Sequence, residues 1–297
     1  MKGFGDKKKS KKKILNEFQI KQYHNQIMLR AFKYHSEGNI SEAKKSYQYL
    51  IKEGFKDIRV FNNYGMILLN SGDLRQARIF ISKVIEINPK DEVAYSNLGG
   101  ILKELGELKD AELLIRKAIE LNPKNSTAYS NLGGILQDLG ELKEAEICTR
   151  KAIELNPYFA TAYLNLGIIF KKSDKLTEAE IYTRKAIELN PKISEAHSNL
   201  GGILRDLGKL KEAEIYTRKA IELNPNFANA YLNLGRILYD LGKLKESELI
   251  LLKAIELNPD LAAAYYSLSN IGELNNQKKW IDYLFTEDLL ERQDDIN

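Results

Sequence analysis

The stretch EVAYSNLGGILKELGELKDAELLIRKAIELNPKN, residues 92–125, shows how the sequence is organised. The next 34 residues, STAYSNLGGILQDLGELKEAEICTRKAIELNPYF, are identical to it at 24 positions. All six prolines recur at the same interval, each directly after an asparagine: Pro89, Pro123, Pro157, Pro191, Pro225 and Pro259. A constant period of this length indicates an array of helix–turn–helix units.

Each unit begins with a pattern typical of an amphipathic helix. In residues 92–125 the residues on its core-facing side are Tyr95, Leu98, Gly99 and Leu102. Gly106 is expected to end this helix, because glycine adopts the left-handed conformation without a Cβ penalty. Asp174 takes this place in a later unit and tolerates the same conformation.

A second helical pattern completes each unit. Its apolar side in residues 92–125 consists of Leu108, Ala111, Ala118 and Leu121. The Asn122-Pro123 pair stops this helix, since proline disfavours helical geometry in the residue before it. Small residues such as Gly99 and Ala111 predict places where neighbouring helices approach closely.

These residues carry a family resemblance. The order Tyr-x-x-Leu-Gly-x-x-Leu, followed by two alanines and a proline at fixed offsets, resembles the tetratricopeptide repeat (TPR). It is similar to the TPR regions of bacterial glycosyltransferases and sulfotransferases and of O-linked N-acetylglucosamine transferase. The resemblance implies an all-α fold, a right-handed superhelical solenoid of stacked antiparallel helix pairs.

We expect three parts along the chain. Residues 1–13 form a basic tail that is expected to be disordered, because like charges repel and little apolar surface compensates for ordering. Residues 262–297 are interpreted as a partial repeat, a capping helix that includes Trp280, and an acidic tail, since an open array needs a polar cap. Residues 14–261 form the array of about seven repeats, at 24–57 (degenerate, with Gly54-Phe55 in place of Asn-Pro), 58–91, 92–125, 126–159, 160–193, 194–227 and 228–261.

The charge distribution bears on location and partners. The formal net charge is +4, but residues 1–13 hold seven lysines and one aspartate, so the rest of the chain is slightly acidic. This argues against a nucleic-acid-binding protein. The single cysteine, Cys148, fits a reducing compartment, and no apolar stretch resembles a transmembrane helix or a signal peptide. We expect a cytoplasmic protein without membrane contact, although the lysine-rich tail leaves anionic lipid as an alternative.

An asparagine recurs on the side of the first helix opposite the core, at the sixth position of each unit from residue 58 onward. In the family, the second, fifth, sixth, ninth, twelfth and thirteenth positions line the inner groove. An asparagine amide offers two donors and an acceptor, so it can pair with a peptide backbone. The row, which resembles the asparagine ladder of O-linked N-acetylglucosamine transferases, consists of Asn63, Asn97, Asn131, Asn165, Asn199 and Asn233. Passive copying during repeat duplication is the competing interpretation.

Glycines and charged residues share this face. Gly100, Gly134 and Gly202 indicate room for a ligand backbone or, equally, tighter helix packing. The candidate peptide-binding cations are Lys103, Lys171 and Arg205. Acidic residues stand beside them, so the face has mixed charge, unlike the basic, aromatic-rich groove that nucleic acid requires. It also differs from the carboxylate clamp of chaperone-binding family members.

No pattern in the sequence indicates catalysis. There is no phosphate-binding glycine loop and no His-Glu-x-x-His motif. His197 stands where other units have a core tyrosine, so we interpret it as a packing residue. Cys148 is interpreted as an apolar filler, since no base accompanies it. We therefore expect no catalytic residue, no metal, no cofactor and no enzymatic activity.

The expected function is that of a non-catalytic protein–protein interaction scaffold, which binds a protein or peptide ligand as an extended segment in its groove. An alternative is an accessory or relic module of a glycosyltransferase or sulfotransferase system, presenting substrate to a separately encoded enzyme. End-to-end stacking into oligomers is a third possibility, and the sequence leaves the oligomeric state open.

Overall fold

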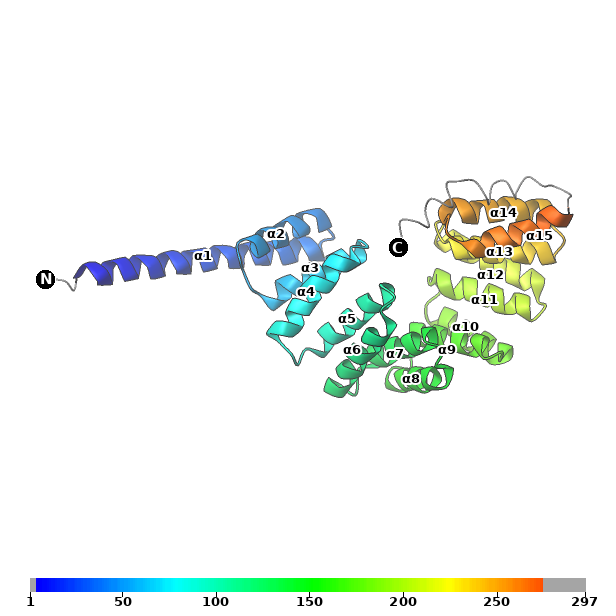
Figure 1. Ribbon diagram of the computed structural model, residues 1–297, viewed down its shortest axis with the longest axis horizontal. Helices are drawn as coiled ribbons and strands as arrows, with labels where there is room; N and C mark the ends of the chain where they lie inside the picture. The colour runs from blue at the N-terminus through cyan, green and yellow to red at the C-terminus, as the bar shows by residue number, and fades with distance from the viewer. Residues whose placement is uncertain (1–3, 275–297) are drawn as a thin grey trace. The chain divides into compact units, whose positions relative to one another are not determined.

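The computed structural model describes residues 4–274, with side chains from Phe18 to Ile271. These residues form helices and no strands, which confirms the all-α prediction. The helices are α1 (Phe4–Ser36), α2 (Ile40–Lys52), α3 (Ile58–Asn70), α4 (Leu74–Ile87), α5 (Glu92–Glu104), α6 (Leu108–Leu121), α7 (Ser126–Asp138), α8 (Leu142–Leu155), α9 (Ala160–Lys172), α10 (Leu176–Leu189), α11 (Ser194–Asp206), α12 (Leu210–Leu223), α13 (Ala228–Asp240), α14 (Leu244–Leu257) and α15 (Ala262–Leu274) (Figure 1).

The 34-residue period of the sequence reappears in the helices. From α3 onward every odd-numbered helix starts one period after the previous one, at Ile58, Glu92, Ser126, Ala160, Ser194, Ala228 and Ala262. We call the odd-numbered helices first helices and the even-numbered ones second helices. Some starts carry a side-chain cap: Asp91 accepts a hydrogen bond from the backbone N–H of Ala94 at 2.9 Å.

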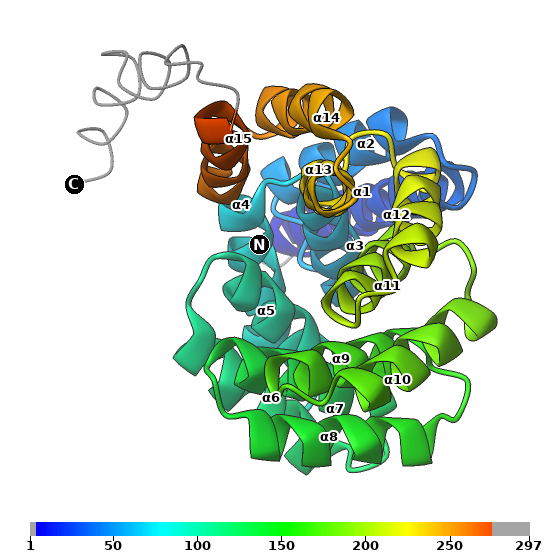
Figure 2. The same cartoon turned by 90° about the vertical axis from the view of Figure 1, so that its right-hand side faces the viewer.

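The chain divides into two compact units, residues 1–139 and 140–297, and we treat each by itself. Within the second unit α9, α11 and α13 each pack against their own second helix and against the second helix before it, and α15 packs against α14. Consecutive first helices also contact each other, α9 with α11, α11 with α13 and α13 with α15. Figures 1 and 2 show these helix pairs stacked side by side from α9 and α10 to α15. The first helices therefore line one face of this unit.

The turns inside the pairs confirm the predicted stop signals. Gly106 has a φ of 79°, and its backbone N–H donates to the carbonyl of Lys103 at 3.0 Å. Asp174 takes the same place with a φ of 59°, the only positive value for a non-glycine residue among the described residues. Glycine or aspartate at this position thus turns the chain directly back into the second helix.

Close contact between the helices of a pair depends on a glycine at the eighth position. A Cβ atom on Gly99 would lie 2.6 Å from Ile115, and one on Gly201 would lie 2.0 Å from the Thr217 hydroxyl. Thr217 is completely buried and donates its hydroxyl to the carbonyl of Ala213 at 2.8 Å. The small residues predicted at these places therefore permit the pairs to form.

The N-terminal region differs from its prediction. Residues 1–13 were expected to be disordered, but α1 starts at Phe4 and runs without a break to Ser36. Lysine is a good helix former, and a helix lengthens more easily than it nucleates, so the apolar segment that follows can propagate helix into the lysine-rich stretch.

The first repeat ends differently from the others. Gly54, with a φ of 75°, replaces the Asn-Pro stop, and the Phe55 N–H donates to the Leu50 carbonyl at 2.9 Å.

At the other end, α15 begins the expected partial repeat, and its Leu268 and Ile271 are buried against α14 residues such as Leu251. Trp280 and the acidic tail lie outside the described residues. Of the helices in residues 4–274, none combines the length and the apolar character that a membrane crossing requires.

Candidate ligand-binding face

The asparagine row occupies one register on the first helices of each unit. In the second unit Asn165, Asn199 and Asn233 lie on α9, α11 and α13, and all three are half-buried. In the first unit Asn63, Asn97 and Asn131 occupy the same register on α3, α5 and α7 and are also half-buried. We call the surface presented by α9, α11 and α13 the inner face of the second unit.

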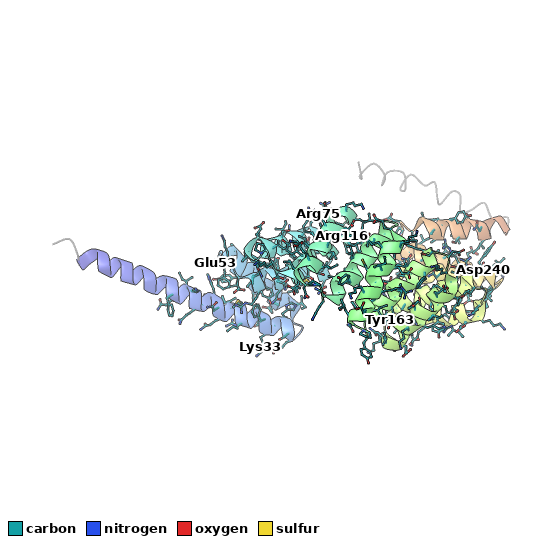
Figure 3. The ribbon with its side chains drawn as sticks, turned by 90° about the horizontal axis from the view of Figure 1, so that it is seen from below. Lys33, Glu53, Arg75, Arg116, Tyr163 and Asp240 are labelled. Carbon is teal, nitrogen blue, oxygen red and sulfur yellow. The ribbon has the colours of Figure 1, made fainter. Side chains whose placement is uncertain are left out.

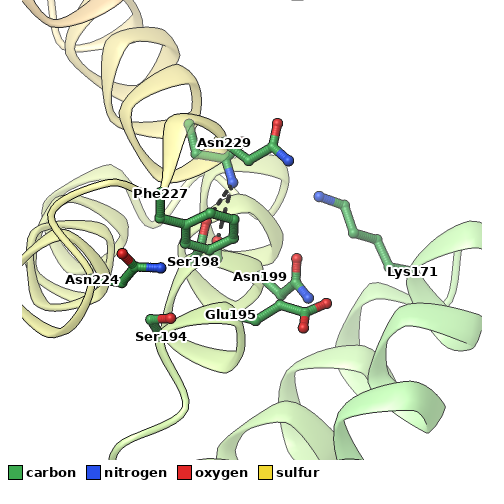
Figure 4. A pocket seen from close by; sticks show the side chains of 9 residues that line it. Lys171, Ser194, Glu195, Ser198, Asn199, Asn224, Phe227 and Asn229 are labelled. Carbon is green, nitrogen blue, oxygen red and sulfur yellow. Dashed lines mark hydrogen bonds between the residues drawn. The ribbon is translucent and has the colours of Figure 1, made fainter. Parts of the chain in front are cut away.

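A pocket of about 470 Å³ opens on this face. Figure 4 shows Asn199 and Glu195 on α11, Asn229 on α13, and Lys171 reaching toward them from α9. The half-buried ring of Phe227 supplies the apolar part of the lining. The remaining lining is polar and consists of Ser194, Ser198, Asn224 and Asn233. Such a site offers donors and acceptors to a ligand and little apolar surface.

The serines before the asparagines, at the fifth position of their units, lie on the inner side but are covered by the next helix. The fifth position was predicted to line the inner groove, and Ser198 does line the pocket, but it is only 1% exposed and Ser130 likewise. The following first helix covers this position, and its asparagine donates to the serine. Asn233 Nδ2 lies 3.0 Å from the Ser198 hydroxyl and 3.3 Å from its carbonyl. Asn131 donates to Ser96 in the same way, at 3.5 Å.

The asparagines therefore differ in what they can offer a ligand. Asn233 and Asn131 use their NH₂ groups between helices, and Asn63 donates to the Tyr47 hydroxyl at 3.3 Å. Within the part of the chain that the structure describes, the side chains of Asn97 and Asn199 have no hydrogen-bond partner. An asparagine amide carries two donors and an acceptor. Asn199 thus presents a complete amide to the pocket.

The predicted cations are joined to the following helix. Lys103 pairs with Asp138 at 3.3 Å, and Lys171 pairs with Asp206 at 3.1 Å. Arg205 pairs with Asp240, the last residue of α13. Asp240 is labelled in Figure 3. Each pair connects the twelfth position of one unit to the thirteenth position of the next. Half-exposed pairs of this kind contribute about 0–1 kcal/mol each, so a ligand can compete for these cations.

The glycines of the face also differ from one another. A Cβ atom on Gly202 would lie 2.9 Å from Lys171 Nζ and 3.9 Å from Asn233 Nδ2. A Cβ atom on Gly100 would meet no other atom within 4 Å. Gly202 therefore leaves room for the pocket's own lysine, whereas Gly100 leaves open space beside α5.

His197 has a structural role, as its position in the repeat predicted. It is 5% exposed, and its Nε2–H donates to the carbonyl of Pro191 at 2.9 Å. Tyr231 makes the corresponding bond one repeat later, from its hydroxyl to Pro225 at 3.1 Å. Cys148 is buried as well. Among the described residues no three His, Cys, Asp or Glu side chains gather where they could hold a metal ion.

Comparison with known proteins gives a consistent result for the repeats. Family models described as tetratricopeptide repeat match residues 58–91, 93–125, 114–147, 160–193, 194–227 and 216–248. Together these matches cover more than half of the chain. A search of curated proteins found no match.

Many solved structures are similar to the chain. A tetratricopeptide repeat protein from Parabacteroides merdae has a TM-score of 0.69 and 20% identity, over 84% of this chain and 99% of that one. A chain of the APC/C hetero-tetramer Cut9–Hcn1 has a TM-score of 0.73 and 18% identity, over 82% of this chain and 48% of that one. YrrB, described as a TPR protein with an unusual peptide-binding site, is 29% identical over 63% of this chain and 96% of its own, with a TM-score of 0.45.

Proposed function

The chain belongs to the tetratricopeptide repeat family, and from this premise we propose that it is a non-catalytic scaffold that binds an extended polypeptide segment on the inner face of its second unit. The observation that supports this most strongly is the amide of Asn199, half-buried in a polar pocket and without a hydrogen-bond partner among the described residues. The general use of this fold in protein interaction agrees with the proposal, but only as an analogy between folds.

The pocket suits the backbone of an extended chain. A peptide backbone offers an N–H and a C=O at each residue, and the Asn199 amide can pair with both. Asn233 keeps its amide oxygen as an acceptor, although its NH₂ group is held by Ser198. Phe227 offers an apolar surface to a neighbouring side chain. Backbone pairing of this kind binds a segment with little dependence on its side chains.

The strength of such binding can be estimated. A neutral hydrogen bond contributes about 1 kcal/mol net, so a few of them with one apolar contact total about 5–6 kcal/mol, an affinity on the order of 0.1 mM. Loss of the Asn199 side chain should then weaken binding roughly fivefold. We therefore expect reversible binding, as suits a scaffold.

The test is selection from a library of random short peptides displayed on phage, followed by fluorescence polarisation with the enriched peptides. The wild type should enrich peptides that bind Asn199→Ala about fivefold more weakly. Asn226→Ala is the matched control, because Asn226 is exposed in the turn before α13 and does not line the pocket. Equal affinity for all three proteins would place binding elsewhere, and failure to enrich any peptide would contradict the proposed function.

The alternative of an accessory module for a glycosyltransferase or sulfotransferase uses the same binding step. It remains a prediction from the resemblance of the repeats, as does the cytoplasmic location. An assay with sugar-nucleotide or sulfate donors separates catalysis from presentation. We expect no turnover from this chain alone, and robust turnover would overturn the non-catalytic assignment.

A further inference from the structure

Arg236 is a cation on the inner face of the second unit whose charge is not paired. It lies on α13, one helical turn after Asn233 and therefore on the same side of the helix. Its Nε donates to the Ser267 hydroxyl on α15 at 3.0 Å. No carboxylate in the described part of the chain lies within ion-pair distance of its guanidinium. The nearby cations Lys171 and Arg205 each have an aspartate partner.

The surroundings of Arg236 make its unpaired charge unfavourable. The side chain is half-buried, and burial lowers the pKa of its guanidinium. The charge of Arg205 lowers this pKa as well, while Asp206 acts in the opposite direction. Arginine nevertheless remains charged in proteins. A partly desolvated positive charge without a counter-ion is unfavourable, and an incoming anion would relieve it.

The local charges do not cancel within the chain. Asp206 is held by Lys171, and Asp240 is held by Arg205, so among these five groups one positive charge is left at Arg236. The bond from Nε to Ser267 fixes the direction of the guanidinium and leaves its two NH₂ groups as donors. Two parallel N–H donors match the two oxygens of a carboxylate.

The position of Arg236 relates it to the pocket. Gly202 on α11 occupies the register that Arg236 occupies on α13, and the space that a side chain would take there holds the Lys171 Nζ of the pocket. Asn233 lies between the two features, since its Nδ2 is 3.9 Å from the Cβ that Gly202 lacks. A segment held at Asn199 and Asn233 can therefore extend along the face toward Arg236.

Resting on the proposed function, we propose that Arg236 binds the carboxylate of an Asp or Glu side chain in the bound segment. The inner face of the second unit then selects extended polypeptides with an acidic residue at one fixed position. Asn199 and Asn233 bind the backbone of the segment, and Arg236 selects the acidic side chain.

Selection with the phage-displayed peptide library tests this, because peptides fused to the coat protein through their C-terminus have no free terminal carboxylate. Wild type and Arg236→Lys should both enrich peptides with Asp or Glu at one position. Arg236→Gln should lose this preference, and Arg236→Glu should favour Lys or Arg there. A synthetic peptide from the wild-type pool, amidated at its C-terminus, should bind Arg236→Gln about tenfold more weakly. Lys211→Gln removes the same charge from an exposed site on α12 and should bind as wild type does.

Three outcomes are informative, provided that thermal unfolding shows each variant to be folded. A shift of charge preference with the residue at position 236 supports the proposal. The proposal about Arg236 would be overturned if wild type and Arg236→Glu enriched peptides with the same charge preference. If those peptides still bound Asn199→Ala more weakly, the proposed function would remain intact. Failure of the wild type to enrich any peptide would overturn both.

Discussion

At the scale of single residues, His197 shows how one repeat departs from its neighbours. Its ring stacks on Tyr216 with centroids 5.9 Å apart, as Tyr163 stacks on Tyr182 at 6.4 Å one repeat earlier. Its Nε2–H replaces the tyrosine hydroxyl in the bond to the proline carbonyl. Its Nδ1, however, is buried without a hydrogen-bond partner among the described residues.

We predict that His197→Tyr stabilises the protein by about 1 kcal/mol, because it keeps the bond to Pro191 and removes an unsatisfied buried acceptor. The urea midpoint of unfolding measures this. Tyr231→His is the reverse change in the following repeat and should lower the midpoint. A lower midpoint for His197→Tyr would show that a tyrosine does not fit beside Tyr216.

Two glycines of the first helices should respond in opposite ways to alanine. Gly201→Ala places a Cβ 2.0 Å from the Thr217 hydroxyl and should destabilise by about 1–3 kcal/mol through overpacking. Gly100→Ala meets no atom within 4 Å and should stabilise by up to about 1 kcal/mol through helix propensity. Thermal unfolding of both variants measures the difference. Equal effects would mean that the close contact at Gly201 does not control the packing of its pair.

At the scale of helices, the sequence was sufficient for the main features of a single 34-residue helix pair. The starts of the helices, the turn at Gly106 and the close contact at Gly201 follow from residues within one 34-residue unit. The burial of Ser198, the ion pair of Lys171 with Asp206 and the unpaired charge of Arg236 were not predicted. Each depends on the distance between one first helix and the next. That distance cannot be derived from the spacing of residues along the chain.

The second helices are connected by charge networks of their own. Glu214 receives Lys243 Nζ at 2.8 Å and the Arg218 guanidinium at 2.7 Å. Arg218 also reaches Glu246 one repeat further along. The hydrogen bond from Lys243 lowers the pKa of the Glu214 carboxyl, and the bond from Arg218 adds to this against the opposing effect of burial. Such networks join consecutive repeats.

The lowered pKa of Glu214 gives a pH dependence of known sign. A carboxyl group with a lower pKa in the folded state stabilises the protein above its unfolded pKa, and this contribution is lost as the pH falls through the folded value. We therefore expect stability to fall as the pH drops below the ordinary glutamate value of 4.5. Urea midpoints across this range should fall less steeply for Glu214→Gln than for wild type. Parallel curves for the two proteins would contradict this account.

At the scale of the whole molecule, stability in a repeat array is close to a sum of repeats and their neighbouring contacts. A ligand that bridges α11 and α13 touches two consecutive repeats and so stabilises the contact between them. The family could be inferred from the sequence, because the 34-residue period is repeated along most of the chain. The candidate site could be inferred only as a row of asparagines, since the pocket exists through the neighbouring helices that surround Asn199 and Asn233.

The most direct test of the central claim is amide hydrogen exchange, followed by mass spectrometry, with and without a peptide enriched by the wild type. We predict slower exchange in residues 194–206 and 228–240, which form α11 and α13, and little change in residues 210–223 of α12. Protection confined to α12 and α14, or no protection in the second unit, would contradict binding on the inner face.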